Sequence, residues 1–129
     1  MKTNYAELTE AFEKLTIDPA NFGHIEHVGV AYTMLLKYDF LTATAKYAKS
    51  IHTIATCAGA ANKFNMTITI AFLSLIAERM SVTIYTDADD FFARNQDLMT
   101  IEPIKQLYSG ERLHSQQAHI NFLLPDLTA

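Results

Sequence analysis

The stretch MTITIAFLSLIAERM, residues 66–80, decides the fold of this chain. Its first twelve residues carry no charged side chain, and the first charges are those of Glu78 and Arg79. A helix needs about 20 apolar residues to cross a bilayer, so this run is too short to span a membrane. It predicts an element of the hydrophobic core and a protein without a membrane partner.

The sequence of this stretch is compatible with two secondary structures, a strand and a helix. Residues 67–70 alternate threonine and isoleucine, as a strand does, and residues 82–85 would then supply a partner strand. The length of the run favours one helix over residues 67–80 instead. That helix is apolar on nearly all sides, and its narrow polar stripe consists of Thr67, Ala71, Ser74 and Glu78. Such a helix should be enclosed by others.

Amphipathic periodicity predicts further helices on both sides of this central one. Apolar residues recur three or four apart in residues 5–15, 22–38 and 40–58. Asp39 can cap the third helix and Gly59 can end it. Because almost no linker separates the second helix from the third, residues 22–58 should form an antiparallel helix hairpin.

Shorter elements are expected downstream of the central helix. Thr86 and Asp89 resemble a capping box that opens a helix reaching residue 94. Two more short helices are predicted at residues 102–108 and 115–122, and residues 124–126 should be extended. The predicted fold is a single all-α domain, residues 1–129: a small helical bundle whose hairpin packs on a buried central helix, with short C-terminal helices and an extended tail.

Composition agrees with this fold and argues against several classes of function. Only 4 glycines and 3 prolines occur in 129 residues, which disfavours a turn-rich β fold. The net charge of −4 and the scattered lysines and arginines argue against a nucleic-acid partner. Glu7, Glu10 and Glu13 interrupt any N-terminal signal sequence, so we expect a cytoplasmic protein. Cys57, the single cysteine, lies in an apolar run and is expected to be buried.

Two histidines are the strongest candidates for chemistry. His24 and His27 stand three residues apart on the apolar face of the second helix, where both rings could hold one transition metal or one polar ligand. Glu78 would complete a set of two histidines and one carboxylate, with a divalent transition metal as the implied cofactor. The alternative is that both histidines are hydrogen-bonded core or rim residues and that Glu78 is exposed. A di-iron site is disfavoured, because it needs the Glu-x-x-His sequence twice and this chain has it once, at Glu111 and His114.

The entrance to the central helix is a second candidate. Lys63 and Asn65, with Thr67 nearby, could bind an anion together with the free N–H groups of the first helical turn. The other histidines, His52, His114 and His119, are expected at the surface. No nucleophile triad, glycine-rich phosphate loop or CxxC pair supports nucleophilic catalysis or nucleotide binding.

Four short motifs, spread over residues 20–127, resemble those of a family of small, all-helical bacterial proteins of uncharacterised function. They are Phe22-x-His24-x-Glu26-His27-Val28, Lys63-Phe64-Asn65-x-Thr67-Ile68-Thr69-x-Ala71-Phe72, Glu111-Arg112-Leu113-x-Ser115 and Leu124-Pro125-Asp126. In that family the turn before the central helix reads Lys-Tyr-His-Glu-Thr, whereas this chain has Asn65 and Met66 in place of the histidine and the acid. The resemblance implies a helical fold and a weakened metal site at this turn, with no established activity or cofactor.

Three functions compete at this point. The first is a small metal-dependent enzyme that uses His24 and His27, with Glu78, Lys63, Asn65 and Thr67 nearby. The second is a binding module that holds a small molecule in the same pocket. The third is a structural or interaction protein, acting as a homodimer through Phe91 and Phe92 or through residues 82–85. The pocket functions are favoured, because buried histidines and a polar stripe need an explanation that a dimer does not give.

Overall fold

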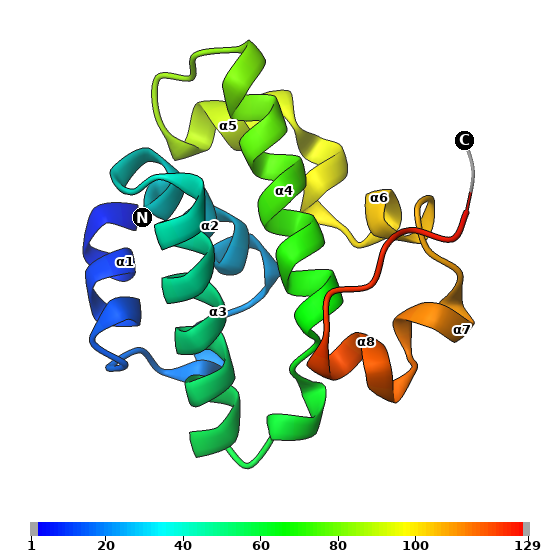
Figure 1. The fold of residues 1–129 in the computed structure, drawn as a ribbon. Coiled ribbons are helices and arrows are strands. Elements are labelled where there is room, and N and C mark those ends of the chain that lie inside the picture. The colour runs from blue at the N-terminus through cyan, green and yellow to red at the C-terminus, as the bar shows by residue number, and fades with distance from the viewer. Residues whose placement is uncertain (1–2, 128–129) are drawn as a thin grey trace.

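The structure is a computed structural model that describes residues 3–127 (Figure 1). These residues form eight α-helices and no strand. The α-helices are α1 (Tyr5–Glu13), α2 (His24–Lys37), α3 (Phe40–Cys57), α4 (Met66–Val82), α5 (Ala88–Arg94), α6 (Glu102–Lys105), α7 (Gly110–Leu113) and α8 (Gln116–Ile120). Three short 3-10 segments lie between them: η1 (Pro19–Asn21), η2 (Ala61–Lys63) and η3 (Gln96–Met99). The predicted all-α fold is confirmed, and the strand alternative for residues 67–70 is wrong because they belong to α4.

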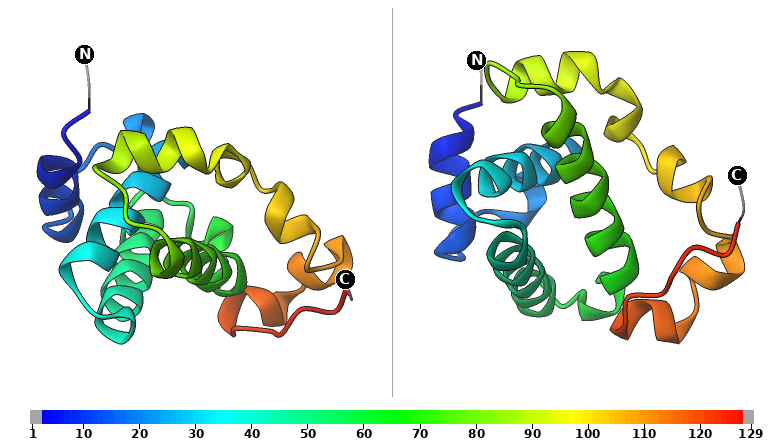
Figure 2. Two further views of the ribbon diagram at one scale, coloured as in Figure 1. Left: turned by 90° about the horizontal axis from the view of Figure 1, so that it is seen from above. Right: turned by 45° about the horizontal axis from the view of Figure 1, so that its top comes forward.

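Helix α4 lies at the centre of the arrangement. Helices α2 and α3 contact it from one side and α6 and α8 from the other (Figures 1 and 2). Leu73 and Ile76 on α4 are buried in the main core cluster, which α1, α2, α3 and α5 share. Ala71 belongs to a second cluster that includes Ile104 and Tyr108. Because apolar clusters cover α4 on both sides, the expected enclosure of the central helix is confirmed.

Helices α2 and α3 form the predicted hairpin. The carboxylate of Asp39, which joins them, accepts a hydrogen bond of 2.8 Å from the N–H of Thr42 and so caps α3. On α3, Tyr47 donates its hydroxyl hydrogen to the carbonyl oxygen of His27 on α2, over 3.3 Å. This bond pairs the middle of α3 with the first half of α2, as an antiparallel connection requires. The facing sides of the two helices are buried in the main core cluster through Val28, Ala31, Ala43 and Tyr47.

Helices α1 and α3 end in the same way. Directly after the cap residue of each helix, one residue lies in the left-handed region of backbone space, with a φ of 61° at Leu15 and 73° at Gly59. The N–H of the next residue then donates to the carbonyl oxygen five residues earlier. These bonds join Thr16 to Ala11 at 2.9 Å and Ala60 to Ala55 at 2.7 Å. The predicted stop at Gly59 is confirmed. A leucine is strained in this conformation and a glycine is not.

The short helices differ from their predictions in detail. Asp87 caps α5 by accepting a bond of 2.8 Å from the N–H of Asp90, and Asp90 in turn accepts from the N–H of Thr86 at 3.0 Å. The predicted capping box of Thr86 and Asp89 is therefore displaced by one residue at each position. The helix expected over residues 102–108 is α6 and ends at Lys105, while the helix expected over 115–122 is α8.

Residues 121–127, which we call the C-terminal tail, follow α8 and contact both α4 and the α6–α7 region. The tail has no helical structure, as predicted for residues 124–126. Its Leu123 donates its N–H to the hydroxyl of Thr67 on α4 at 3.1 Å, and its carbonyl accepts from the hydroxyl of Tyr108 at 2.7 Å. Asp126 accepts a bond of 2.6 Å from the hydroxyl of Ser109. The tail is thus bonded to the rest of the fold through side chains.

Two predictions about burial are wrong. Cys57 is exposed because it is the last residue of α3, on a helical turn that extends past the neighbouring helices. Phe91 is fully buried in the main core cluster, and Phe92 packs against that cluster, so this pair does not form an exposed apolar surface. Within residues 3–127, no helix combines the length and the apolar character needed to cross a membrane.

Candidate functional site

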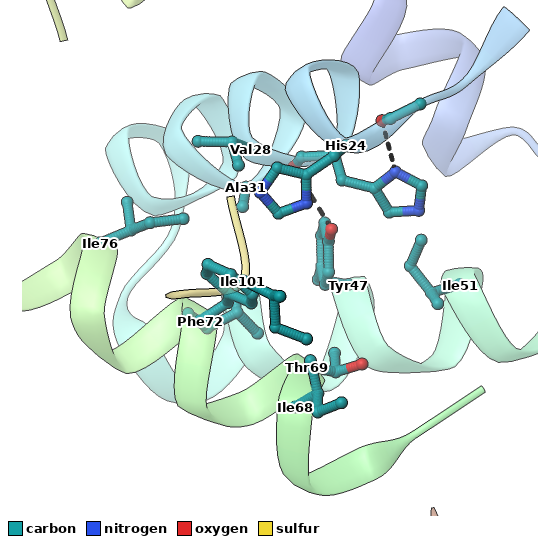
Figure 3. A pocket seen from close by; sticks show the side chains of 13 residues that line it. His24, Val28, Ala31, Tyr47, Ile51, Ile68, Thr69, Phe72, Ile76 and Ile101 are labelled. Atoms are coloured by element: carbon teal, nitrogen blue, oxygen red, sulfur yellow. Dashed lines mark hydrogen bonds between the residues drawn. The ribbon is translucent and has the colours of Figure 1, made fainter. Parts of the chain in front are cut away.

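A cavity of about 310 Å³ lies between α2, α3 and α4 (Figure 3). Its walls are mainly apolar: Val28, Ala31, Ile51, Ile68, Phe72, Leu73, Ile76 and Ile101. Its polar side chains are His24, His27, Tyr47 and Thr69. A cavity of this size, with apolar walls and few polar groups, is typical of a small-molecule site.

The first turn of α2 places both histidines at this cavity. Gly23 caps α2, and its own N–H donates to the carboxylate of Glu26 at 2.7 Å, which fixes the start of the helix. From there His24 reaches the exposed rim of the cavity, and His27, one turn further, is half-buried in the wall. The structure thus places both histidines in the lining of one cavity.

Each histidine is held by a backbone carbonyl, which determines where its proton lies. The Nδ1 of His27 lies 2.6 Å from the carbonyl oxygen of Gly23, one of the two bonds drawn in Figure 3. The Nε2 of His24 lies 2.9 Å from the carbonyl oxygen of Leu98. Because a carbonyl oxygen can only accept, these two ring nitrogens are the donors. In the neutral rings, Nε2 of His27 and Nδ1 of His24 are therefore acceptors.

The environment of His27 favours its neutral form. Burial lowers the pKa of His27 below the usual 6.5, and the neighbouring His24 lowers it further, while the bond to Gly23 opposes the shift. The ring packs against Phe22, with centroids 4.4 Å apart. At neutral pH, Nε2 of His27 thus carries a lone pair, and among residues 3–127 the only side-chain hydrogen bond of His27 is the one from Nδ1.

The other two polar side chains of the cavity already have partners. The hydroxyl of Tyr47 donates to the carbonyl of His27, and burial raises the pKa of this phenol far above its ordinary value. The hydroxyl of Thr69 donates to the carbonyl of Asn65 at 2.8 Å. Neither hydroxyl is a strong base, so the acceptors of the cavity are the free ring nitrogens of the two histidines, and that of His27 is the one in the half-buried wall. Sequence analysis missed both residues, because Tyr47 lies in an apolar stripe and Thr69 in an apolar run.

Glu78 is not part of this cavity. It is exposed, and it lies six residues beyond Phe72, about 9 Å along the axis of α4. At about 100° per residue it also shares the face of Thr67 and Ser74, opposite the face that Phe72 and Ile76 turn to the cavity. Among residues 3–127, no three side chains of His, Cys, Asp or Glu are grouped as metal ligands. The structure does not assemble the set of His24, His27 and Glu78.

The residues at the entrance of α4 serve the fold instead of a common pocket. Asn65 is buried, caps α4 through a bond of 2.9 Å from the N–H of Ile68, and donates to the carbonyl of Leu113 at 2.8 Å. Thr67 is buried and donates to the carbonyl of Asn121 at 2.7 Å. Lys63 is exposed on η2 and does not line the cavity. The structure therefore separates Lys63, Asn65 and Thr67 from the two histidines.

No family model, curated protein or solved structure matches this chain. The resemblance to small helical bacterial proteins therefore stays a prediction from short motifs. In the structure, the third and fourth motifs contact each other. The Nε of Arg112, in the third motif, donates to the carbonyl oxygen of Leu124, in the fourth, at 2.7 Å.

Proposed function

We propose that this protein binds a small, largely apolar molecule in the cavity between α2, α3 and α4. The bound molecule carries one hydrogen-bond donor, an N–H or O–H group, which it gives to Nε2 of His27. The observation that carries this proposal is the fixed, neutral ring of His27 in an otherwise apolar wall. An apolar body would fill the cavity, and the single polar contact would orient it.

This proposal is preferred to a metal-dependent enzyme because of the ligand set. A transition metal bound by His24 and His27 would need a further protein ligand, and Glu78 lies outside the cavity. The two histidines offer one free ring nitrogen each, Nδ1 of His24 and Nε2 of His27, and no carboxylate of the lining joins them. The polar groups present are those of a binding site, with Nε2 of His27 as an acceptor in the half-buried wall and Nδ1 of His24 as an acceptor at the exposed rim.

A matched pair of probes tests the proposal. N-phenylnaphthylamine is an apolar fluorophore with a single N–H, and benzylnaphthalene has the same shape with a CH₂ group in its place. We expect N-phenylnaphthylamine to bind more tightly by about 3- to 10-fold, the effect of one net hydrogen bond. Fluorescence titration measures the first probe, and its displacement by the second measures the carbon analogue.

Two variants locate the binding. His27→Phe keeps an aromatic ring but removes the acceptor, so the advantage of N-phenylnaphthylamine should disappear. His114→Phe changes an exposed histidine that does not line the cavity and should leave both affinities unchanged. Equal binding of the two probes to the unmodified protein, or no binding of either, contradicts the proposed function.

The second candidate function is a homodimer, favoured by two exposed apolar residues where α4 ends. Val82 and Ile84 are 80% and 93% exposed. A self-associating surface at this point would bury them against a second copy. Sedimentation over a range of concentrations, with Ile84→Lys as the variant, tests it. If the protein is a monomer at every concentration, the homodimer is rejected. This result would not bear on the proposed binding cavity.

A further inference from the structure

A second cavity, of about 490 Å³, lies between α3, α4 and α8. Figure 1 shows α3 and α8 on either side of the first half of α4. We call this cavity the α3–α8 groove. It shares no lining residue with the cavity at His27, so it is a separate site whose occupation does not depend on the proposed function.

The titratable side chains that line the α3–α8 groove are all basic. They are Lys49 and His52 on α3 and His119 on α8. This is unusual for a chain in which 14 acidic residues outnumber 10 lysines and arginines. Among residues 3–127 Lys49 forms no ion pair, so its ammonium group is available to an anion.

The hydrogen bonds of the lining leave further groups available. The Nδ1 of His119 lies 2.9 Å from the carbonyl oxygen of Ser115 and donates to it, so Nε2 of the neutral ring is an acceptor. The ring of His52 forms no hydrogen bond within residues 3–127, so its N–H is available to a ligand. The hydroxyl oxygen of Thr44 is buried and has no hydrogen-bond partner within the described residues.

The rest of the lining is apolar. Phe64 and Ile70 form part of the wall, and the ring of Phe64 lies 5.0 Å from that of His52. Ile120, at the end of α8, is 66% exposed and lies at the edge of the groove. An occupant would therefore need an apolar body as well as a group that attracts cations.

From this combination we propose that the α3–α8 groove binds a small organic anion, a carboxylate on an apolar body. The carboxylate would lie against Lys49 and His52, and the apolar body against Phe64 and Ile70. A carboxylate accepts hydrogen bonds from the ammonium group of Lys49 and from the ring N–H of His52, and both side chains line the groove. A cationic or neutral molecule of the same shape gains no such contact.

Three probes with the same eight-carbon body test this proposal: octanoate, octanol and octylammonium. Titration of isotopically labelled protein, followed by amide NMR shifts, gives both the affinity and the location of binding. We expect octanoate to bind about fivefold or more tightly than either of the others. The shifts should map to α3, the start of α4 and α8.

Matched variants decide whether the groove is responsible. Lys49→Met should weaken octanoate about fivefold or more, while Lys46→Met, three residues earlier on the same helix and outside the lining, should change it less than about twofold. Ala45→Phe, at an exposed lining position, should block the groove for all three probes. His27→Phe should leave octanoate binding unchanged, because that residue lines the other cavity.

Several results would overturn the proposal. Equal affinity for octanoate and octylammonium would show that the charge of the probe does not matter for binding. An unchanged affinity for octanoate in Lys49→Met would show the same for the charge of Lys49. Amide shifts confined to the lining of the His27 cavity would place the anion elsewhere. Absence of binding by all three probes would show that the groove is not a site for such molecules.

Discussion

The ring of Tyr5 lies directly on the backbone of Gly29, where α1 crosses α2. A Cβ added to Gly29 would overlap the atoms of that ring. The missing side chain is therefore what allows the two helices to approach so closely. Tyr5 also packs edge-on against Phe92, with centroids 5.4 Å apart, so displacing its ring would disturb a second contact.

We expect Gly29→Ala to destabilise the protein by about 1–3 kcal/mol, the usual cost of overpacking a core. Gly110→Ala is the matched control, since a Cβ at that position meets no atom within 4 Å. Urea unfolding of the two variants measures the difference. Equal stability of both variants would show that the contact between Tyr5 and Gly29 relaxes without cost.

Leu15→Gly should stabilise the protein by about 1 kcal/mol. Leu15 has a φ of 61°, and its side chain is 47% exposed, so relief of strain outweighs the lost packing. Gly59→Ala, at the equivalent position after α3, should be destabilising by a similar amount. Thermal unfolding of both variants checks that the changes in stability have opposite signs. Changes of the same sign would contradict this prediction.

Thr67→Val should loosen the C-terminal tail. The variant keeps the shape of the side chain but removes the hydroxyl that bonds both the carbonyl of Asn121 and the N–H of Leu123. The expected loss is about 1–3 kcal/mol of stability, with faster amide exchange in residues 121–127. Thr53→Val removes a hydroxyl that bonds only within α3 and should have little effect. Unchanged exchange in the tail would refute this role of Thr67.

Stability should increase with pH in the range just below the ordinary histidine pKa. The pKa of His27 is lowered in the folded state, first by burial and then by His24, so between that value and the usual 6.5 the unfolded chain binds more protons than the folded one. The contribution of His27 is then complete above about pH 6.5 and is lost as the pH falls towards the folded pKa. Unfolding at several pH values, with His27→Phe as the variant, measures it. A pH profile that is the same in both proteins would contradict this prediction.

The affinity for N-phenylnaphthylamine should respond to the same titration. Protonation of His27 replaces the lone pair on Nε2 with an N–H, which cannot accept from the probe. Affinity should therefore fall once the pH drops below the lowered pKa of His27, whereas the affinity for benzylnaphthalene should stay closer to constant. A fall that is equal for both probes would point to unfolding and not to the histidine.

Glu78→Gln separates the binding cavity from the metal hypothesis. Since Glu78 is exposed and outside the lining, we expect no change in probe affinity or in the metal content of untagged protein. The double variant His24→Ala, His27→Ala is the comparison for elemental analysis. Near-stoichiometric metal that is lost in both variants would establish the site with two histidines and one carboxylate.

The main elements of the fold could be predicted because their signals are local. The length of the run at residues 66–77, the cap at Asp39 and the stop at Gly59 each depend on a few neighbouring residues. The exposure of Cys57 could not be predicted in this way, since it depends on how far α3 extends beyond the helices that pack on it.

The candidate site was predicted only in part, because it depends on which face of α4 meets which partner. The two histidines share one helical turn, so their proximity follows from spacing alone. The polar stripe with Thr67 and Glu78 was visible in the sequence, but nothing local shows that the stripe lies opposite the cavity. Thr67 is satisfied by Asn121, which lies 54 residues away in sequence.

That separation in sequence bears on how the chain folds during synthesis. At about 5–20 residues per second, the ribosome needs about 3 to 11 seconds to add the 54 residues between Thr67 and its partner in the C-terminal tail. During this interval the hydroxyl of Thr67 lacks its partner in the tail, and Ala71 stays uncovered until Ile104, Tyr108 and Leu113 have been added. Emergence of the tail, and not formation of α4, is thus the event that gives the Thr67 hydroxyl its partner, whereas the second core cluster is complete once Leu113 has been added.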